Sequence, residues 1–199
     1  MNREPRGSRD AEILPGDPLR IGSPAANLGM SQPTPRICFA LLSLAACAGG
    51  LRAGEPLADH LARSSWAELE CVYRSADVGA IPCGFHAGTA VYPDGARIRG
   101  AAANALWQGK HFRCGEMLNQ WSGFKAIKAD VYAGRSWLDG GPATVLDYRE
   151  SSFVWRRVRD EIREVAPGVY LGVMFREPRR RAPPGSRPEI QAFFVLTRE

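Results

Sequence analysis

No apolar run in the chain is long enough to cross a bilayer as a helix. The longest one extends over residues 37–48, which is 12 residues, whereas a spanning helix needs about 20. A short apolar run that follows a basic residue and precedes small residues is typical of a secretory signal peptide. Residues 36–53 are therefore predicted to be a signal peptide, and the protein is expected to be exported, either to the periplasm or to a lipid-anchored position at the cell envelope.

The first 35 residues lack any apolar periodicity. They are rich in proline, glycine, serine and arginine, a composition that cannot build a packed core. Residues 1–35 are predicted to be a disordered extension. Both Met1 and Met30 remain candidate start positions, because Met30 would leave a short basic segment directly before the signal peptide.

The end of the signal peptide is open between two alternatives. The sequence Leu-Ala-Ala-Cys at residues 44–47 is similar to the bacterial lipobox, in which the cysteine becomes the lipidated first residue. Cys47 is therefore the lipidation candidate, and one lipid chain would anchor the protein to a membrane. Ordinary cleavage before Gly49 or Gly54 is the alternative.

The chain also lacks a large excess of charge of one sign. Residues 54–199, predicted to form a single domain, hold 20 basic and 17 acidic residues, which is too small a difference to indicate a nucleic-acid partner. The basic segment 176–188 is rich in proline and glycine and is predicted to be a solvated hairpin loop.

Motifs of common enzymes and metal sites are missing. The chain has no G-x-S-x-G, no P-loop, no G-x-G-x-x-G and no H-E-x-x-H. Its three histidines have no metal-ligand spacing. Neither a cofactor nor a metal is predicted, and the balance of these absences is against an enzyme.

Cysteines are few and show no C-x-x-C spacing. Three lie beyond the signal peptide, at Cys71, Cys83 and Cys114. An oxidising compartment permits one disulfide among them. Cys83 and Cys114 both lie beside glycine in expected loops and form the candidate pair, with three unpaired thiols as the alternative.

The remaining sequence predicts a mainly β domain with a short helix at its start. Ser65 and Glu68 form a capping box, and apolar residues follow at helical spacing, so a helix is expected over 66–75. Two short extended runs are expected around the turn at residues 93–95. Aromatic and β-branched residues bounded by glycine or proline predict further strands over 105–112, 124–134, 143–148, 168–175 and 189–199.

Residues 151–175 fit two patterns. Apolar residues at spacings of four, four and three fit a helix from Val154 to Val165, whereas the sequence 163–175 fits a strand, a short turn and a strand. A short helical segment over 151–158 followed by a hairpin is favoured. Seven to nine short strands then predict an antiparallel sandwich or barrel.

Charged side chains between apolar neighbours are the candidates for a ligand site. Alternate residues of a barrel strand face the lumen, and a buried charge needs a partner. The alternative is an exterior ladder of ion pairs. Aromatic residues could fill the core or line a cavity. The predicted ligand-binding residues are Trp107, Lys110, Trp121, Tyr132, Trp137, Asp147, Glu161 and Arg163.

Several motifs resemble a known family. The segments 107–112 (WQGKHF), 145–148 (VLDY), 162–175 and 192–196 (AFFVL) are similar to GXWXG/DUF4334 domains, although 78–88 carries Phe85 where that pattern has tryptophan. SWLDGG at 136–141 and RDEIREVAPGVYLG at 159–172 more closely resemble a group of uncharacterised exported bacterial proteins that carry WQGK-F, SWLDG and RDEIREVAPGxYLG. The resemblance covers about residues 66–199. It implies a small lipocalin-like β-barrel and no particular activity.

Three functions are compatible with these features. The leading one is an exported barrel that binds a small apolar or amphipathic molecule. A hydrolase of small substrates that uses Asp147 or Glu161 as a general base is the second. An envelope structural or interaction protein with a filled barrel is the third. A hollow lumen would favour the first two over the third.

Overall fold

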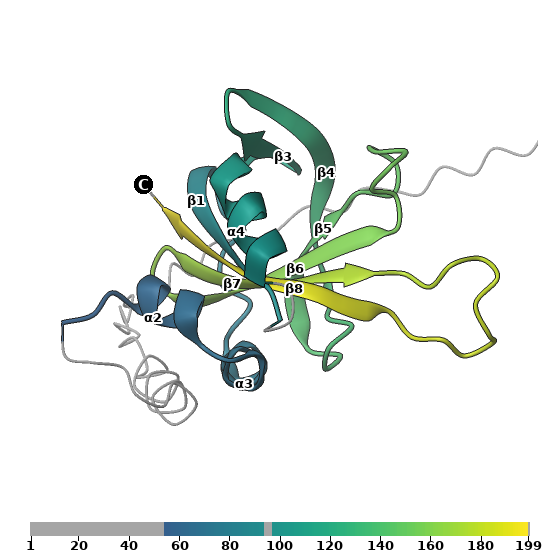
Figure 1. Ribbon diagram of the computed structural model, residues 1–199, viewed down its shortest axis with the longest axis horizontal. Helices are drawn as coiled ribbons and strands as arrows, with labels where there is room; N and C mark the ends of the chain where they lie inside the picture. Colours follow the sequence, from purple (N-terminus) through teal and green to yellow (C-terminus); the bar gives the residue numbers. More distant parts are fainter. Residues whose placement is uncertain (1–53, 94–96, 199) are drawn as a thin grey trace, which may run out of the picture. The chain divides into compact units, whose positions relative to one another are not determined.

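The computed structural model describes residues 54–93 and 97–198 (Figure 1). The predictions for residues 1–53, namely the extension, the signal peptide, the lipobox and Cys47, lie outside the described residues. Among the helices that are described, none combines the length and the apolar character that a membrane-spanning helix needs.

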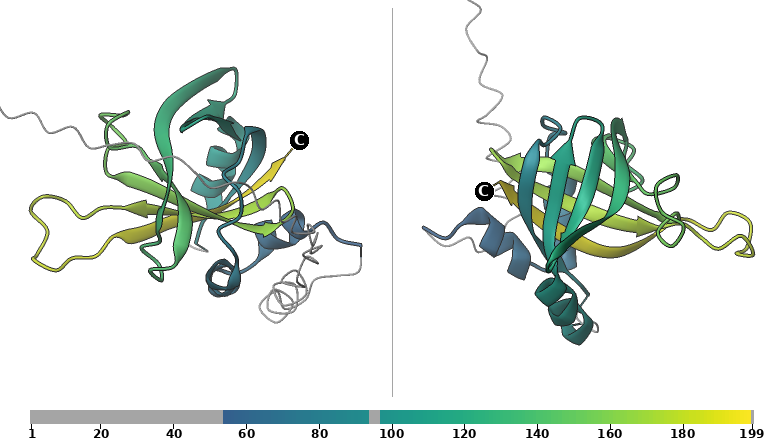
Figure 2. Two further views of the ribbon diagram at one scale, coloured as in Figure 1. Left: turned by 180° about the vertical axis from the view of Figure 1, so that it is seen from behind. Right: turned by 90° about the horizontal axis from the view of Figure 1, so that it is seen from above.

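Eight antiparallel strands form a closed barrel in which every strand pairs with its neighbours in the sequence and β1 pairs with β8 (Figures 1 and 2). The mainly β, barrel-type fold predicted from the sequence is therefore confirmed. The strands are β1 (Gly84–Val91), β2 (Trp107–Arg113), β3 (Glu116–Trp121), β4 (Phe124–Arg135), β5 (Pro142–Asp147), β6 (Val158–Ala166), β7 (Val169–Arg176) and β8 (Glu189–Arg198).

Side-chain alternation divides each strand between the lumen and the exterior. In β6, Asp160 and Ile162 face the lumen, whereas Glu161 and Arg163 face outward. All four of these side chains are buried, because other elements cover the outer face of β6. A strand that is buried on both faces carries charges only where each charge has a partner.

One half of the lumen is filled with side chains. Large apolar residues from different strands meet there, among them Phe112, Met117, Ile162, Tyr170 and Leu196. His86 of β1 lies between the rings of Phe112 and Tyr170, with ring centroids 5.5 Å from each. This half is a packed core.

Two helices cover the outer face of β6, β7 and β8. They are α2 (Leu57–Arg63) and α3 (Trp66–Ser75), which bury Leu69, Val72 and Tyr73 against apolar residues of the sheet. The predicted helix 66–75 is confirmed with its capping box, since the Ser65 side chain accepts from Glu68 N and the Glu68 carboxylate accepts from Ser65 N.

Some local predictions were wrong. The second extended run after the turn at 93–95 is instead α4 (Arg97–Leu106), because its sequence RIRGAAANAL is rich in alanine, the strongest helix former. The expected short helix at 151–158 is a series of turns before β6. The hairpin that follows is confirmed, and Gly168 in its turn has φ 74°.

The predicted disulfide between Cys83 and Cys114 is also wrong, because both are exposed free thiols. Cys83 directly precedes β1 and Cys114 directly follows β2. The pairing of Gly84 with Phe112 places Cys83 opposite Arg113, so Cys114 is one residue out of register and directed to the other face.

Candidate functional site

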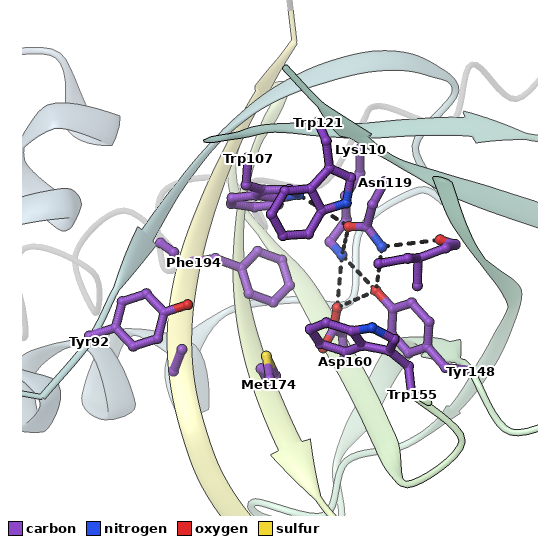
Figure 3. A pocket seen from close by; sticks show the side chains of 13 residues that line it. Tyr92, Trp107, Lys110, Asn119, Trp121, Tyr148, Trp155, Asp160, Met174 and Phe194 are labelled. Atoms are coloured by element: carbon purple, nitrogen blue, oxygen red, sulfur yellow. Dashed lines mark hydrogen bonds and ion pairs between the residues drawn. The ribbon is translucent and has the colours of Figure 1, made fainter. Parts of the chain in front are cut away.

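A cavity of about 70 Å³ occupies the other half of the lumen. It lies at the end of the barrel where odd-numbered strands finish and even-numbered strands begin, the end that also carries α4. Six of its thirteen lining residues are aromatic, and a small group of polar side chains lies at its base (Figure 3). The lining residues are Ala90, Tyr92, Trp107, Lys110, Asn119, Trp121, Ile127, Tyr148, Trp155, Asp160, Met174, Ala192 and Phe194.

Lys110 is the centre of the polar group. Its Nζ donates to Asp160 Oδ2 at 2.8 Å, to the Tyr148 hydroxyl at 2.9 Å and to Asn119 Oδ1 at 3.0 Å. The three donor protons of the ammonium thus have three acceptors. The side chains of Lys110 and Asp160 are almost completely buried, so the two charges neutralise each other inside the barrel.

Asn119 and Tyr148 connect this ion pair to the wall. Asn119 Oδ1 accepts from Trp107 Nε1 at 3.1 Å, and Asn119 Nδ2 donates to the Tyr148 hydroxyl at 3.1 Å. The Tyr148 hydroxyl in turn donates to Asp160 Oδ2 at 2.8 Å. A network in which every bond has a defined direction holds its members in a single arrangement.

A backbone irregularity completes the position of Asn119. The pairing of β3 with β4 shifts between Leu118 and Asn119, so Ile127 has no direct partner and adopts φ 62°. A left-handed conformation is rare for a β-branched residue and is strained. In this position the Ile127 carbonyl accepts from Asn119 Nδ2 at 3.2 Å, while the Ile127 side chain lines the cavity.

Burial and the neighbouring charge set the protonation of the network. Desolvation lowers the pKa of Lys110, and the Asp160 carboxylate opposes this effect. Desolvation, together with the Asp160 charge, raises the pKa of Tyr148 well above its ordinary value. Tyr148 therefore stays a neutral hydroxyl donor. The Lys110 ammonium also lies 5.1–5.6 Å from the ring centroids of Trp107, Tyr148 and Phe194, where the ring faces favour a cation.

Two polar atoms of the cavity lining are buried without a hydrogen-bond partner. They are Asp160 Oδ1, an acceptor, and Trp121 Nε1, a donor. Most buried polar groups in proteins have a partner, and leaving one without a partner costs about 1–3 kcal/mol. Two residues of the cavity lining thus hold one unused acceptor and one unused donor.

Two glycines define where the aromatic wall lies. An added Cβ at Gly172 would lie 2.1 Å from the Phe194 ring, and one at Gly88 would lie 2.5 Å from the Trp107 ring. Each ring therefore packs directly on the backbone of a neighbouring strand. Larger residues at these glycines would push the rings into the cavity.

The structure brings some predicted ligand-binding residues together and separates the others. Trp107, Lys110 and Trp121 line the cavity, as expected from the sequence. Tyr132 and Asp147 instead lie on the outer surface, where the Tyr132 hydroxyl donates to Asp147 Oδ2 at 3.0 Å. Asp147 alternates with the lumenal residues on either side of it and therefore cannot face the cavity.

Glu161 and Trp137 also lie outside the lumen. The Glu161 carboxylate accepts from Trp137 N at 2.9 Å and lies 3.0 Å from Arg159 Nε. Burial raises the pKa of Glu161. The Arg159 guanidinium in turn lies 4.3 Å from the centroid of the Trp137 ring. Glu161 thereby ties the loop between β4 and β5 to the barrel.

Arg163 has a structural role on the same outer face. Its guanidinium donates to both oxygens of Asp139 at 2.7 Å, to Tyr73 O at 2.8 Å and to Pro142 O at 2.9 Å. It thus joins the end of α3 to the SWLDGG loop. The prediction that Glu161 and Arg163 anchor a ligand does not agree with these positions.

Several cavity residues were absent from the predicted set. They are Ala90, Tyr92, Asn119, Ile127, Tyr148, Trp155, Asp160, Met174, Ala192 and Phe194. A signal for Asp160 is present in the sequence: strict alternation along RDEIRE separates Asp160 and Ile162 from Glu161 and Arg163. Asn119 carries no comparable signal, because its strand was not predicted.

The fold and the site together define a closed eight-stranded antiparallel β-barrel with a cavity at one end and a buried Lys–Asp pair at its base. Within the described residues, no three of the His, Cys, Asp and Glu side chains are grouped as metal ligands. No family model and no curated protein matches the chain. A crystal structure of a protein from Thermomonospora curvata is similar, with 18% identity and a TM-score of 0.46 over 68% of this chain and 88% of that one.

Proposed function

We propose that the protein binds one small, uncharged, amphipathic molecule in the cavity beside Asp160. The observation that carries this proposal is the unpartnered Asp160 Oδ1 within a wall of aromatic side chains. A ligand hydroxyl or N–H would donate to this oxygen. A ligand carbonyl or ether oxygen could accept from Trp121 Nε1, and an apolar body would contact Trp107, Trp155 and Phe194.

The neutral balance of the site favours an uncharged ligand. Lys110 already compensates the charge of Asp160 at 2.8 Å. A charged ligand group would leave one unpaired charge in a desolvated site, which costs several kcal/mol. The cavity therefore selects against carboxylates and ammonium groups.

The size of the cavity restricts the ligand further. One water needs about 10–15 Å³ of such space, so about 70 Å³ suits the body of a molecule with several heavy atoms. Ligand pockets of this kind are mostly apolar with a few placed polar groups. A long lipid chain would have to extend beyond the barrel end.

The two alternative functions have less support. A hydrolase would need a carboxylate on the cavity, and neither Asp147 nor Glu161 lies there. Asp160 does, but its Oδ2 is committed to Lys110 and Tyr148, which suits orientation of a ligand better than proton abstraction. A structural protein with a filled lumen would have no use for an open half with unpartnered polar atoms.

Native mass spectrometry of the protein from its own envelope fraction tests the proposal first. We expect a mass excess that disappears on denaturation and identifies the ligand. The same spectrum tests export: a chain that begins at Gly49 or Gly54, or a lipidated Cys47, supports it. A full-length mass would contradict it.

Binding to defined probes tests the chemistry of the cavity. Cyclohexanol, cyclohexane and cyclohexanecarboxylate share one ring and differ in the polar group. We expect cyclohexanol to bind most tightly and to shift the Trp121 indole N–H signal in a ¹⁵N–¹H spectrum, with Trp121→Phe assigning that signal. Asp147→Asn, which changes a carboxylate outside the cavity, is the control. If the carboxylate binds best, or if no indole signal moves, the proposed site is wrong.

A further inference from the structure

Two loops at the end of the barrel that holds the cavity contain the excess positive charge of the domain. They are the β5–β6 loop (residues 148–157) and the β7–β8 loop (residues 177–188). Together they contain seven arginines and two glutamates, a net charge of +5. The rest of residues 54–199 has 13 basic and 15 acidic residues and is thus slightly negative. The described domain is therefore electrically polarised toward the end with the cavity.

The two loops lie against each other. Glu177 N donates to Arg157 O at 2.8 Å, and Arg149 forms an ion pair with Glu177. The β7–β8 loop is the long hairpin connection that projects from the barrel in Figures 1 and 2. Its four arginines are all exposed, so they form a cationic surface with the neighbouring loop.

An apolar tip accompanies this cationic surface. Phe153 is 83% exposed and Val154 is 80% exposed, and they are adjacent in the β5–β6 loop. The Arg156 guanidinium lies 4.9 Å from the centroid of the Phe153 ring. Trp155, the next residue after Val154, turns inward and lines the cavity. Large apolar side chains that a fold leaves in water are typical of an interaction surface.

We propose that the β5–β6 and β7–β8 loops dock on a bilayer that contains anionic lipid. The arginines contact lipid phosphates, while Phe153 and Val154 reach past the headgroups to the start of the acyl chains. Attraction between basic residues and anionic lipid adds to the burial of apolar side chains in such an interface. Docking in this way brings the end of the barrel that holds the cavity to the membrane, although the inference does not depend on what the cavity holds.

The apolar tip favours a bilayer over a nucleic acid. Arginines alone would suit the phosphates of either partner. A single-stranded nucleic acid uses aromatic rings as stacking platforms, and Val154 offers none. An aliphatic side chain next to a phenylalanine matches the acyl region of a bilayer, where both lose contact with water.

Co-sedimentation of the full chain with vesicles tests the charge dependence. Vesicles of phosphatidylcholine alone are compared with vesicles that contain about a third phosphatidylglycerol. Because the apolar run at 37–48 could bind both kinds of vesicle, the readout is the difference between them. We expect tighter binding to the anionic vesicles and a loss of that preference at high salt.

Matched double variants locate the charge effect. Arg180→Ser/Arg181→Ser should weaken binding to anionic vesicles by about fivefold for each arginine. Arg113→Ser/Arg198→Ser removes the same charge from exposed positions at the other end of the barrel and should have little effect. Equal losses in the two variants would show attraction to the net charge alone and would overturn the proposal.

A third measurement tests insertion of the apolar tip. In Phe153→Trp, bromine on the acyl chains should quench the additional tryptophan fluorescence. In Phe153→Ser/Val154→Ser, binding should weaken, whereas Ile81→Ser, a change at another exposed apolar residue, should leave it unaltered. Absence of both quenching and weakening overturns the proposal. Binding to a single-stranded oligonucleotide without any preference for anionic vesicles also overturns it, in favour of a nucleic-acid surface.

Discussion

At the residue scale, the Lys110–Asp160 ion pair fixes the positions of the polar side chains at the base of the cavity. Buried ion pairs are weak evidence for stability, since desolvation offsets much of their attraction. Here, however, each partner also bonds Tyr148, and Lys110 bonds Asn119 directly. The ion pair thus contributes more to holding the cavity residues in one arrangement than to the free energy of unfolding.

Removing one partner of this pair should be much worse than removing both. Lys110→Met leaves a buried carboxylate without its counter-charge, so we expect a loss of about 3–5 kcal/mol in the free energy of unfolding. Lys110→Met/Asp160→Asn removes both charges and should recover a large part of that loss. Urea unfolding of the two variants and of Asp160→Asn measures the coupling. Additive losses would show that the two residues act independently.

His86 should make the stability of the barrel depend on pH. Desolvation lowers the pKa of His86 below 6.5, helped by the nearby charge of Arg198. Below about pH 6.5 the unfolded chain therefore binds a proton that the folded chain resists, and the free energy of unfolding falls by at most about 1.4 kcal/mol per pH unit. Above that pH the effect of His86 is absent.

Urea unfolding at about pH 7.5 and about pH 5.5 measures this effect. His86→Leu places an apolar side chain between Phe112 and Tyr170 and removes the titrating group. We expect the variant to lose less stability between the two pH values than the unaltered chain. An equal loss in both would assign the pH dependence to other groups.

At the element scale, the irregular pairing of β3 with β4 determines the shape of the site. In a regular ladder the Ile127 carbonyl would accept from a backbone N–H of the neighbouring strand. The shift between Leu118 and Asn119 leaves this carbonyl free to accept from Asn119 Nδ2. β-Bulges next to functional sites commonly redirect groups in this way. The strain at Ile127 is thus localised next to the polar network.

Glycine should be preferred over alanine at position 127, against the usual order for a strand. Both substitutions remove the same apolar side chain, but only glycine adopts φ 62° without strain. Ile127→Gly should therefore be about 1 kcal/mol more stable than Ile127→Ala. Ala129→Gly in the same strand, at ordinary φ, is the control and should be destabilising. Thermal unfolding of the variants decides the order.

The predictability of the elements from sequence follows their local signals. The helix α3 was predictable because its capping box and apolar spacing are contained within a dozen residues. The strand β3 and the start of β1 were missed, since EMLNQW and GFHAG show little enrichment in β-branched residues. The helix α4 was mistaken for a strand, because the preceding Pro-Asp-Gly turn suggested a hairpin and the alanine-rich sequence was given less weight.

At the scale of the whole molecule, the barrel class was predictable while the site was only partly so. The number of strands and their spacing predict an antiparallel sandwich or barrel, and the family resemblance implied the barrel. Which side chains reach the lumen depends on register, and the register shifts at several places. Each shift changes the phase of the alternation. Trp107, Lys110 and Trp121 of the predicted set line the cavity. The other predicted residues lie outside the lumen, namely Tyr132, Trp137, Asp147, Glu161 and Arg163.

The pairing of β8 has a consequence for aggregation of a truncated chain. This last strand pairs with β7 on one side and, by closing the barrel, with β1 on the other. A chain that lost β8 would present two unpaired edges at once, one of them on the apolar strand β7. Open edges of that kind recruit strands from other molecules. Proteolytic removal of this single strand would therefore convert a closed barrel into a template for fibrous association.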